Sequence, residues 1–279
     1  MKIKKNTYEI YSTRTLKKDS LIDRITIITV VYNGEETLEI TIKNILNQDH
    51  KNIEYIIVYT PSNDKTFDII KKYENKIDKI LINFDIGIYQ SMNLGTKFAT
   101  GKYINFMNSG DFFYKKNIVS NLFKIKQKVD VLYGDCKVKY PNFTKTIRSS
   151  SPRDIKYKMF FSHQSSFIKS SIQKEIGFNV KYNLAADYDF FCKLIKSKKK
   201  FKKINFIIST SKAFGIVDIK QTQTLFESYK ITSKIFKKEI NFFKIFLLIK
   251  IFVSLITSQI KILLTKKTTL AILKLISKK

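Results

Sequence analysis

The amino-acid sequence predicts an α/β fold built on a doubly wound sheet. A β-branched run at 25–31 and an apolar run at 53–59 are separated by a segment whose apolar residues recur with helical spacing. Continuous apolar runs of this length are typical of strands buried on both faces of a parallel sheet. Strands that alternate with helices in this way indicate the α/β class.

The same alternation extends through most of the chain. The predicted strands lie at 25–31, 53–59, 79–83, 103–107 and 129–135, with a last strand that ends near 209. The predicted helices lie near Leu38 to Leu46, near Phe67 to Tyr73, at 88–99, near Ile118 to Ile125, at 170–176 and from about Ala186 to Lys198. The segment from Lys137 to Arg153 is polar and irregular.

Three regions follow from this pattern. Residues 1–22 are polar, lack clear periodicity and are expected to be an N-terminal extension. Residues 23–215 form the α/β domain. Residues 216–279 form a C-terminal tail of different composition.

The composition is strongly basic, with 52 Lys and Arg against 23 Asp and Glu and a net charge of +29. Such a charge favours anionic partners, such as phosphorylated substrates or acidic lipid, although part of it can be solvated surface. The two cysteines, Cys136 and Cys192, exclude a disulfide framework and a four-cysteine zinc site. We expect both to be core residues of a cytoplasmic protein.

The tail combines lysines with an apolar centre. From residue 221 onward it holds twelve Lys but only Glu227 and Glu239 as acids, and 245–256 is apolar except for Lys250 and Ser254. This centre is shorter than the roughly 20 apolar residues that a membrane-spanning helix needs. It predicts a basic amphipathic helix on the inner, anionic face of the cell membrane, a peripheral association. The alternative is a helix packed on the sheet domain.

Polar residues follow three of the predicted strands. Tyr32 and Asn33 follow the first, a polar loop follows Tyr59, and the segment from Asn108 to Asp111 follows the fourth. The carboxyl ends of parallel strands form the ligand-binding edge of an open α/β sheet. Asp111, next to Gly110, could hold Mg²⁺ or Mn²⁺, or it could simply cap a turn.

Four segments, in order, resemble the family 2 glycosyltransferases of the GT-A fold, as found among bacterial surface-polysaccharide sugar transferases. Together they fall between residues 24 and 215. The segments are ITIITVVYNGEETLEITIKNILNQ, IEYIIVYTPSNDKTFDII, FDIGIYQSMNLGTKFATGKYINFMNSGD and FSHQSSFIKSSIQKEIGFNVKYNLAADYDFFCKL. The resemblance implies a nucleotide-binding mixed sheet flanked by helices.

The resemblance also implies roles for individual residues. Asp187 falls on the position of the catalytic base, and Asp111 on that of the metal ligand. Asn108 and Gly110 depart from acidic positions of the metal motif, which implies a metal held weakly or mainly through phosphates. His163 and Gln164 would lie on the acceptor side. The implied donor-binding residues are Tyr32, Asn33, Tyr59, Asp64, Asp85, Asn93 and Asn108.

The implied activity is an inverting, metal-assisted transfer of a sugar from a nucleotide-sugar donor, UDP-linked by preference. The acceptor would be a lipid-linked or cell-surface polysaccharide intermediate. Inversion needs a base opposite the leaving diphosphate. For Asp187 the alternative is an N-cap of the following helix, a role that Asp189 could take instead.

Two other classes of function remain as alternatives. Tyr59, Asn108 and Gly110 leave open a degenerate subunit that binds a nucleotide sugar without catalysis. A basic nucleic-acid-binding protein is the other, but the sequence shows no helix-turn-helix or RNP motif, and no nucleic-acid partner is expected.

Overall fold

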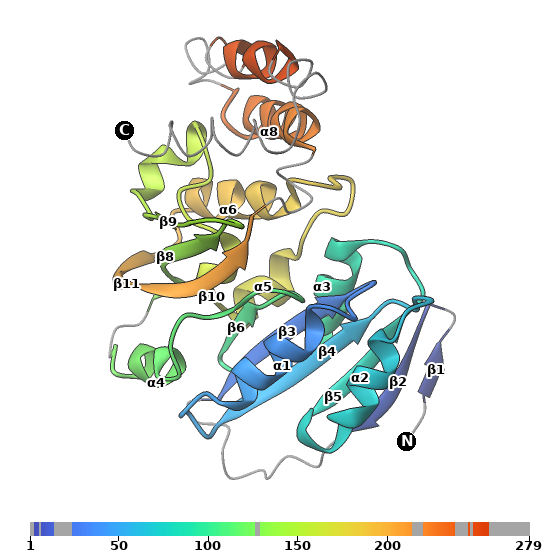
Figure 1. Cartoon of the computed structure of the whole chain (residues 1–279). Coiled ribbons are helices and arrows are strands. Elements are labelled where there is room, and N and C mark those ends of the chain that lie inside the picture. Colours follow the sequence, from blue (N-terminus) through green and yellow to red (C-terminus); the bar gives the residue numbers. More distant parts are fainter. Residues whose placement is uncertain are drawn as a thin grey trace.

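The computed structural model describes residues 3–5, 7–13, 24–125, 129–213, 220–237, 245 and 248–256. Its centre is one continuous mixed sheet with helices on both faces (Figure 1). The parallel part holds four strands in the order β5-β4-β3-β6. These strands are β3 (Ile25–Val31), β4 (Ile53–Tyr59), β5 (Lys79–Asn83) and β6 (Tyr103–Phe106).

The second half of the sheet is mixed. β10 (Ser166–Lys169) runs antiparallel to both β6 and β8 (Val131–Lys139), and β8 runs parallel to β11 (Phe201–Lys212). β7 (Phe112–Phe113) pairs with β11, and β9 (Thr144–Ile147) pairs with β8, both antiparallel. The sheet is therefore mixed, as the resemblance to the family implied.

The alternation of side chains along β3 explains why the sheet separates two cores. Ile28 and Val30 pack in one apolar cluster, whereas Ile25, Ile27 and Val31 pack in the other. Successive side chains of a strand point to opposite faces, so a strand covered on both faces is apolar at every position except where polar groups find partners. Thr29 is such a case, because its hydroxyl donates to the carbonyl oxygen of Met107 at 2.7 Å.

Each face is covered by its own helices, whose apolar sides enter the corresponding cluster. On one face lie α1 (Leu38–Leu46), α2 (Thr66–Lys72) and α4 (Ile118–Phe123). On the other lie α3 (Ile88–Phe98), α5 (Ser170–Ile176) and α6 (Ala186–Lys196). Short 3-10 helices occupy Glu74–Lys76, Pro152–Lys156 and His163–Ser165. The predicted cysteine environment is confirmed, because Cys136 and Cys192 are free and buried.

The N-terminal segment departs from the expectation. β2 (Tyr8–Thr13) pairs antiparallel with β5, and β1 (Ile3–Lys5) pairs with β2, so part of residues 1–22 extends the sheet. Tyr8 is buried and its ring packs edge-on against Phe98. The strand at β9 likewise lies in a segment that the sequence suggested to be irregular.

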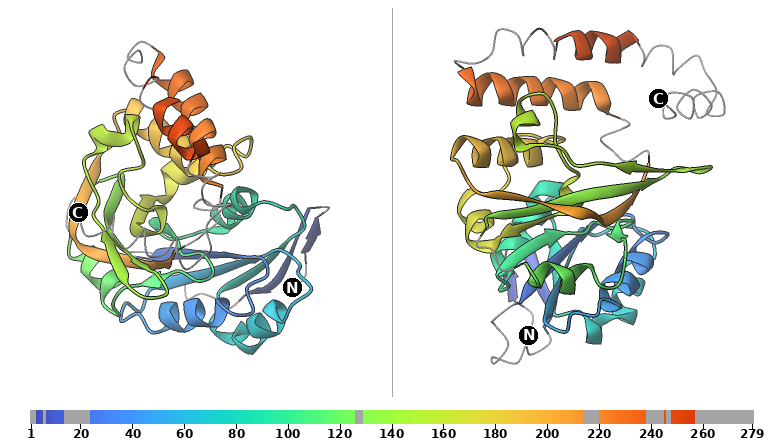
Figure 2. Two further views of the ribbon diagram at one scale, coloured as in Figure 1. Left: turned by 45° about the horizontal axis from the view of Figure 1, so that its top comes forward. Right: turned by 90° about the vertical axis from the view of Figure 1, so that its left-hand side faces the viewer.

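The C-terminal tail is joined to the domain by α8 (Gln221–Ile235), which packs on α6 (Figure 2). Ile231, Ile235 and Phe236 enter the same core as the sheet. For α8 the structure therefore agrees with the alternative of a helix packed on the sheet domain. The domain boundary expected at residue 215 stays a prediction.

Residues 248–256 are helical and lie on the far side of α8 from α6 (Figure 2). Ile251 is buried, and the Ser254 and Thr222 hydroxyls are 2.8 Å apart. The remaining large apolar side chains of this segment are exposed. These are Leu248, Ile249, Phe252, Val253, Leu255 and Ile256. Within the described ranges, no helix is long and apolar enough to cross a membrane.

Candidate functional site

Two adjoining cavities open where the strand order reverses, at the carboxyl ends of β3 and β6. Their volumes are about 700 Å³ and about 630 Å³, and both are lined by Tyr89, Asn108, Ser109 and Leu184. An open α/β sheet binds its ligands at such a switch point, because the loops diverge there to opposite faces. We call the larger one the carboxylate cavity, since Asp111 and Asp187 both line it.

Asp111 reaches the carboxylate cavity through a tight turn after β6. Gly110 has a φ of 94°, a conformation that side chains disfavour, and the Asp111 amide donates to the carbonyl oxygen of Asn108 at 2.9 Å. Burial raises the pKa of Asp111 to about 7, although a hydrogen bond with the Gln164 side chain acts in the opposite direction. The Asp111 carboxylate is thus held without a neutralising cation among the described residues.

Asp187 lies in the first turn of α6 and is held from several sides. The Tyr89 hydroxyl donates to Asp187 Oδ1 at 3.0 Å, and the Tyr188 amide donates to the same oxygen at 2.8 Å. Burial and the nearby Asp187 carboxylate raise the pKa of Tyr89 well above 10, so this hydroxyl keeps its proton. Neither Asp187 nor Asp189 is the N-cap. That position is Ala185, and Asp189 pairs with Lys193 at 2.6 Å.

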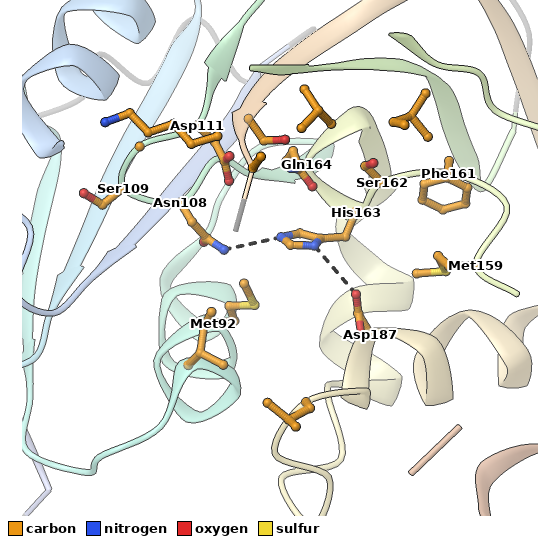
Figure 3. Close-up of a pocket in the computed structure, with 18 of the residues that line it drawn as sticks. Met92, Asn108, Ser109, Asp111, Met159, Phe161, Ser162, His163, Gln164 and Asp187 are labelled. Atoms are coloured by element: carbon orange, nitrogen blue, oxygen red, sulfur yellow. Dashed lines mark hydrogen bonds and ion pairs between the residues drawn. The ribbon is translucent and has the colours of Figure 1, made fainter. Parts of the chain in front are cut away.

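His163 connects Asp187 to the loop after β6 (Figure 3). Its Nδ1 lies 3.6 Å from Asp187 Oδ2, and its Nε2 lies 3.3 Å from Asn108 Nδ2. Burial lowers the pKa of His163, and the Asp187 carboxylate only partly offsets this. A neutral imidazole that accepts from Asn108 at Nε2 carries its proton on Nδ1, on the side that faces the Asp187 carboxylate at 3.6 Å.

The loop after β6 has the chemistry of a partial cation site. Asn108 Oδ1 is buried without a hydrogen-bond partner in the described part of the chain, and Asp111 carries a partly buried carboxylate. Mg²⁺ and Mn²⁺ prefer oxygen ligands of this kind and commonly take the rest from substrate phosphates. Among the described residues there is no group of three or more His, Cys, Asp or Glu that could hold a metal by itself. The residues therefore fit a cation shared with a phosphorylated ligand.

The structure brings together six of the residues predicted from the sequence. Five of them line the carboxylate cavity, and Tyr32, 59% exposed, lines the smaller one. The five are Asn108, Asp111, His163, Gln164 and Asp187.

Five other predicted donor-binding residues do not line either cavity: Asn33, Tyr59, Asp64, Asp85 and Asn93. The side-chain amide of Asn93 makes two hydrogen bonds with the backbone of Phe178. Its nitrogen donates to the carbonyl oxygen, and its oxygen accepts from the backbone N–H, each at 2.8 Å. The Tyr59 ring is buried and its hydroxyl accepts from the Ser62 amide at 2.9 Å. Asn93 and Tyr59 thus have structural contacts in this protein, and their contact with a donor stays a prediction.

Asp64 also serves the local loop. Burial would raise the pKa of Asp64, but hydrogen bonds from Ser62 and Thr66 and from the Glu35 amide outweigh it and lower the pKa to about 2. Asn33 has a φ of 51° and shapes the turn after β3. The exposed Asp85 precedes Ile86 and Gly87, which do line the smaller cavity.

Sequence reasoning missed two residues that organise this site. Tyr89 lies in GIYQSMN, within one of the four segments that resemble the family, so this motif could have identified it. Glu227, on α8, accepts hydrogen bonds from the turn before α6. Its only sequence signal is that it is one of two acids in a lysine-rich segment.

The fold and this site together define an α/β protein with a ligand-sized cavity at the switch point of its sheet, lined by carboxylates from two elements. Residues 26–202 match the glycosyl transferase family 2, and the chain belongs to this family. This is the family that the sequence segments resemble.

Known proteins support this assignment. The chain is 33% identical over 138 residues to WfaP of Escherichia coli, described as a UDP-Glc:alpha-D-GlcNAc-diphosphoundecaprenol beta-1,3-glucosyltransferase. That match covers 49% of this chain and 55% of WfaP, so the chain spans little more than half of the relative's length.

Two solved structures share the fold. S. aureus TarS residues 1–349 in complex with UDP-GlcNAc align with a TM-score of 0.63 at 19% identity, covering 76% of this chain and 66% of TarS. The mannosyltransferase PcManGT from Pyrobaculum calidifontis, in complex with GDP-Man and Mn²⁺, aligns with a TM-score of 0.59 at 13% identity, covering 88% and 82%. At these identities the likeness concerns the fold alone.

Proposed function

We propose that the protein transfers a sugar, with inversion, from a UDP-linked donor to a lipid-linked or cell-surface polysaccharide acceptor. The observation that carries this proposal is the placement of two carboxylates on separate elements around one cavity, Asp111 on the loop after β6 and Asp187 on α6 (Figure 3). One carboxylate can then serve the leaving diphosphate while the other serves the attacking hydroxyl.

Asp187 is the general base of the proposed reaction. It accepts a proton from the acceptor hydroxyl while that oxygen attacks the anomeric carbon and the bond to the nucleotide diphosphate breaks. Hydrogen bonds from Tyr89 and the Tyr188 amide both reach Oδ1, and His163 lies nearer Oδ2. These contacts orient the carboxylate for proton transfer before the acceptor arrives.

Asp111 and Asn108 would hold Mg²⁺ or Mn²⁺ together with the donor's phosphates. A bound divalent cation would offset the negative charge on the departing diphosphate. The UDP preference is supported by the description of WfaP as a UDP-Glc enzyme. The same description, with its diphosphoundecaprenol acceptor, supports a lipid-linked acceptor.

The acceptor class agrees with the surface of the tail. The helical residues 248–256 expose Leu248, Phe252 and Leu255 next to Lys250. Burial lowers the pKa of Lys250, and the charge of nearby Lys158 acts in the same direction. An apolar face among lysines suits peripheral binding to an anionic membrane, where a lipid-linked acceptor would be found. We place the protein on the cytoplasmic face of that membrane.

A thermal-shift screen tests the donor assignment. A ligand that binds only the native state raises the unfolding temperature in proportion to the logarithm of its concentration over Kd. We expect UDP and UDP-sugars with Mn²⁺ to stabilise the full chain more than GDP, CDP or ADP do. Stabilisation by none of these nucleotides would contradict a nucleotide-sugar site. Binding of UDP without hydrolysis of any UDP-sugar would favour the non-catalytic subunit.

A further inference from the structure

One side chain of helix α8, Glu227, contacts the turn beside the carboxylate cavity. Glu227 Oε1 accepts from the Asn183 amide at 3.0 Å, and Oε2 accepts from the amides of Leu184 and Ala185, each at 2.9 Å. One carboxylate thus binds three consecutive backbone N–H groups. Hydrogen bonds to a charged acceptor are about twice as strong as neutral ones.

These three residues form the turn that leads into α6 and to Asp187. Asn183 and Leu184 line both cavities, and Ala185 is the N-cap of α6. An alanine offers no side-chain acceptor for the amides at the start of a helix. Glu227, from a different helix, instead fixes the N-cap residue itself and the two residues before it through their amides, and a negative charge near the start of α6 also interacts favourably with the helix dipole.

The turn and the base are connected by Tyr89. Its hydroxyl lies 3.2 Å from the carbonyl oxygen of Leu184 and 3.0 Å from Asp187 Oδ1. A shift of the turn would therefore change both the start of α6 and the hydroxyl that orients Asp187. Glu227 itself is fixed because α8 buries Ile231 and Ile235 in the main core.

We propose that Glu227 is a positioning residue of the transferase. It holds the turn 183–185 so that Asp187 faces the carboxylate cavity, which makes α8 part of the catalytic apparatus. The effect on turnover rests on the proposed function, in which Asp187 is the base. The effect on the turn rests only on the three contacts.

The test compares Glu227→Ala and the near-isosteric Glu227→Gln with two controls in the full chain. Gln223→Ala changes an exposed residue of the same helix, and Glu175→Ala removes an exposed acid elsewhere. Hydrogen exchange reports on the peptide that spans 183–185. Hydrolysis of UDP-glucose with Mn²⁺ gives kcat and KM, and thermal unfolding verifies that each variant is folded.

Glu227→Ala should accelerate exchange at 183–185 and lower kcat about tenfold or more, with KM for UDP-glucose within about twofold, since a misplacement near 1 Å can cost up to a hundredfold. Glu227→Gln keeps one oxygen acceptor, so its exchange and kcat should lie between those of wild type and Glu227→Ala. The controls should match wild type.

Two outcomes would overturn the inference: exchange at 183–185 in Glu227→Ala that equals the controls, or an unchanged kcat in a variant whose turn has loosened. If wild type fails to hydrolyse the donor, the proposed function fails. The exchange data then still decide whether Glu227 holds the turn. If Glu227→Ala does not fold, hydrogen exchange and kcat of Glu227→Gln decide the question.

Discussion

The partly buried carboxylate of Asp111 should make the metal-free protein less stable as the pH rises. The pKa of Asp111 is raised from 3.8 to about 7 by burial, so the native state keeps a proton that the unfolded chain loses. Stability from this group is complete below about pH 4 and is lost as the pH rises through 7. The whole shift of about three pK units corresponds to at most about 4 kcal/mol, at about 1.36 kcal/mol for each unit.

Asp111→Asn removes this dependence because the amide does not ionise. Between pH 5 and pH 8, in EDTA, the free energy of unfolding of wild type should fall by about 2 kcal/mol more than that of Asp111→Asn, a value discounted for the partial exposure of the side chain. Urea unfolding monitored by circular dichroism measures the difference. Parallel pH profiles for the two proteins would refute the reasoning.

The same pair of proteins provides a positive control at pH 8. Adding Mn²⁺ and UDP should stabilise wild type more than Asp111→Asn, because ligand binding stabilises only a native state that can hold the cation. An equal gain in both proteins would mean that Asp111 is only a turn residue.

Three further results are expected. Tyr89→Phe should lower kcat for donor hydrolysis about tenfold with little change in the Kd of UDP, because only the hydroxyl that orients Asp187 is lost; an unchanged kcat would contradict this. Asp111→Ala should weaken binding of UDP in the presence of Mn²⁺ but not in EDTA, as calorimetry can show. The double change Phe252→Gln with Leu255→Gln should reduce co-sedimentation with anionic vesicles and leave UDP binding intact, since both side chains are exposed; equal pelleting would remove this face from the membrane contact.

The sequence predicted the parallel half of the sheet because its signals are local. β3 and β4 match the predicted 25–31 and 53–59, since strands covered on both faces must be continuously apolar. β1, β2 and β9 lack such runs. They lie at the sheet's margins, where a short polar segment becomes a strand only because a neighbour offers hydrogen bonds.

The placement of a residue at the cavity was predictable where it follows from a strand end, as for Asp111, or from the resemblance to the family, as for Asp187. It was not predictable where a role depends on a distant partner. The side chain of Asn93 is hydrogen-bonded to Phe178, 85 residues away, and Glu227 accepts hydrogen bonds from a turn more than 40 residues before it. Spacing along the chain contains no information about such contacts.

The substitution Asp187→Asn tests whether Asp187 is the base of the proposed UDP-sugar transferase. The measurement is the rate of UDP release from UDP-glucose with Mn²⁺, together with the Kd of UDP for wild type and variant. A general base contributes about a hundredfold or more, so we expect the variant to lose at least that factor while its Kd stays within about twofold. A variant with wild-type turnover, or one that loses UDP affinity instead, would show that Asp187 is not the base.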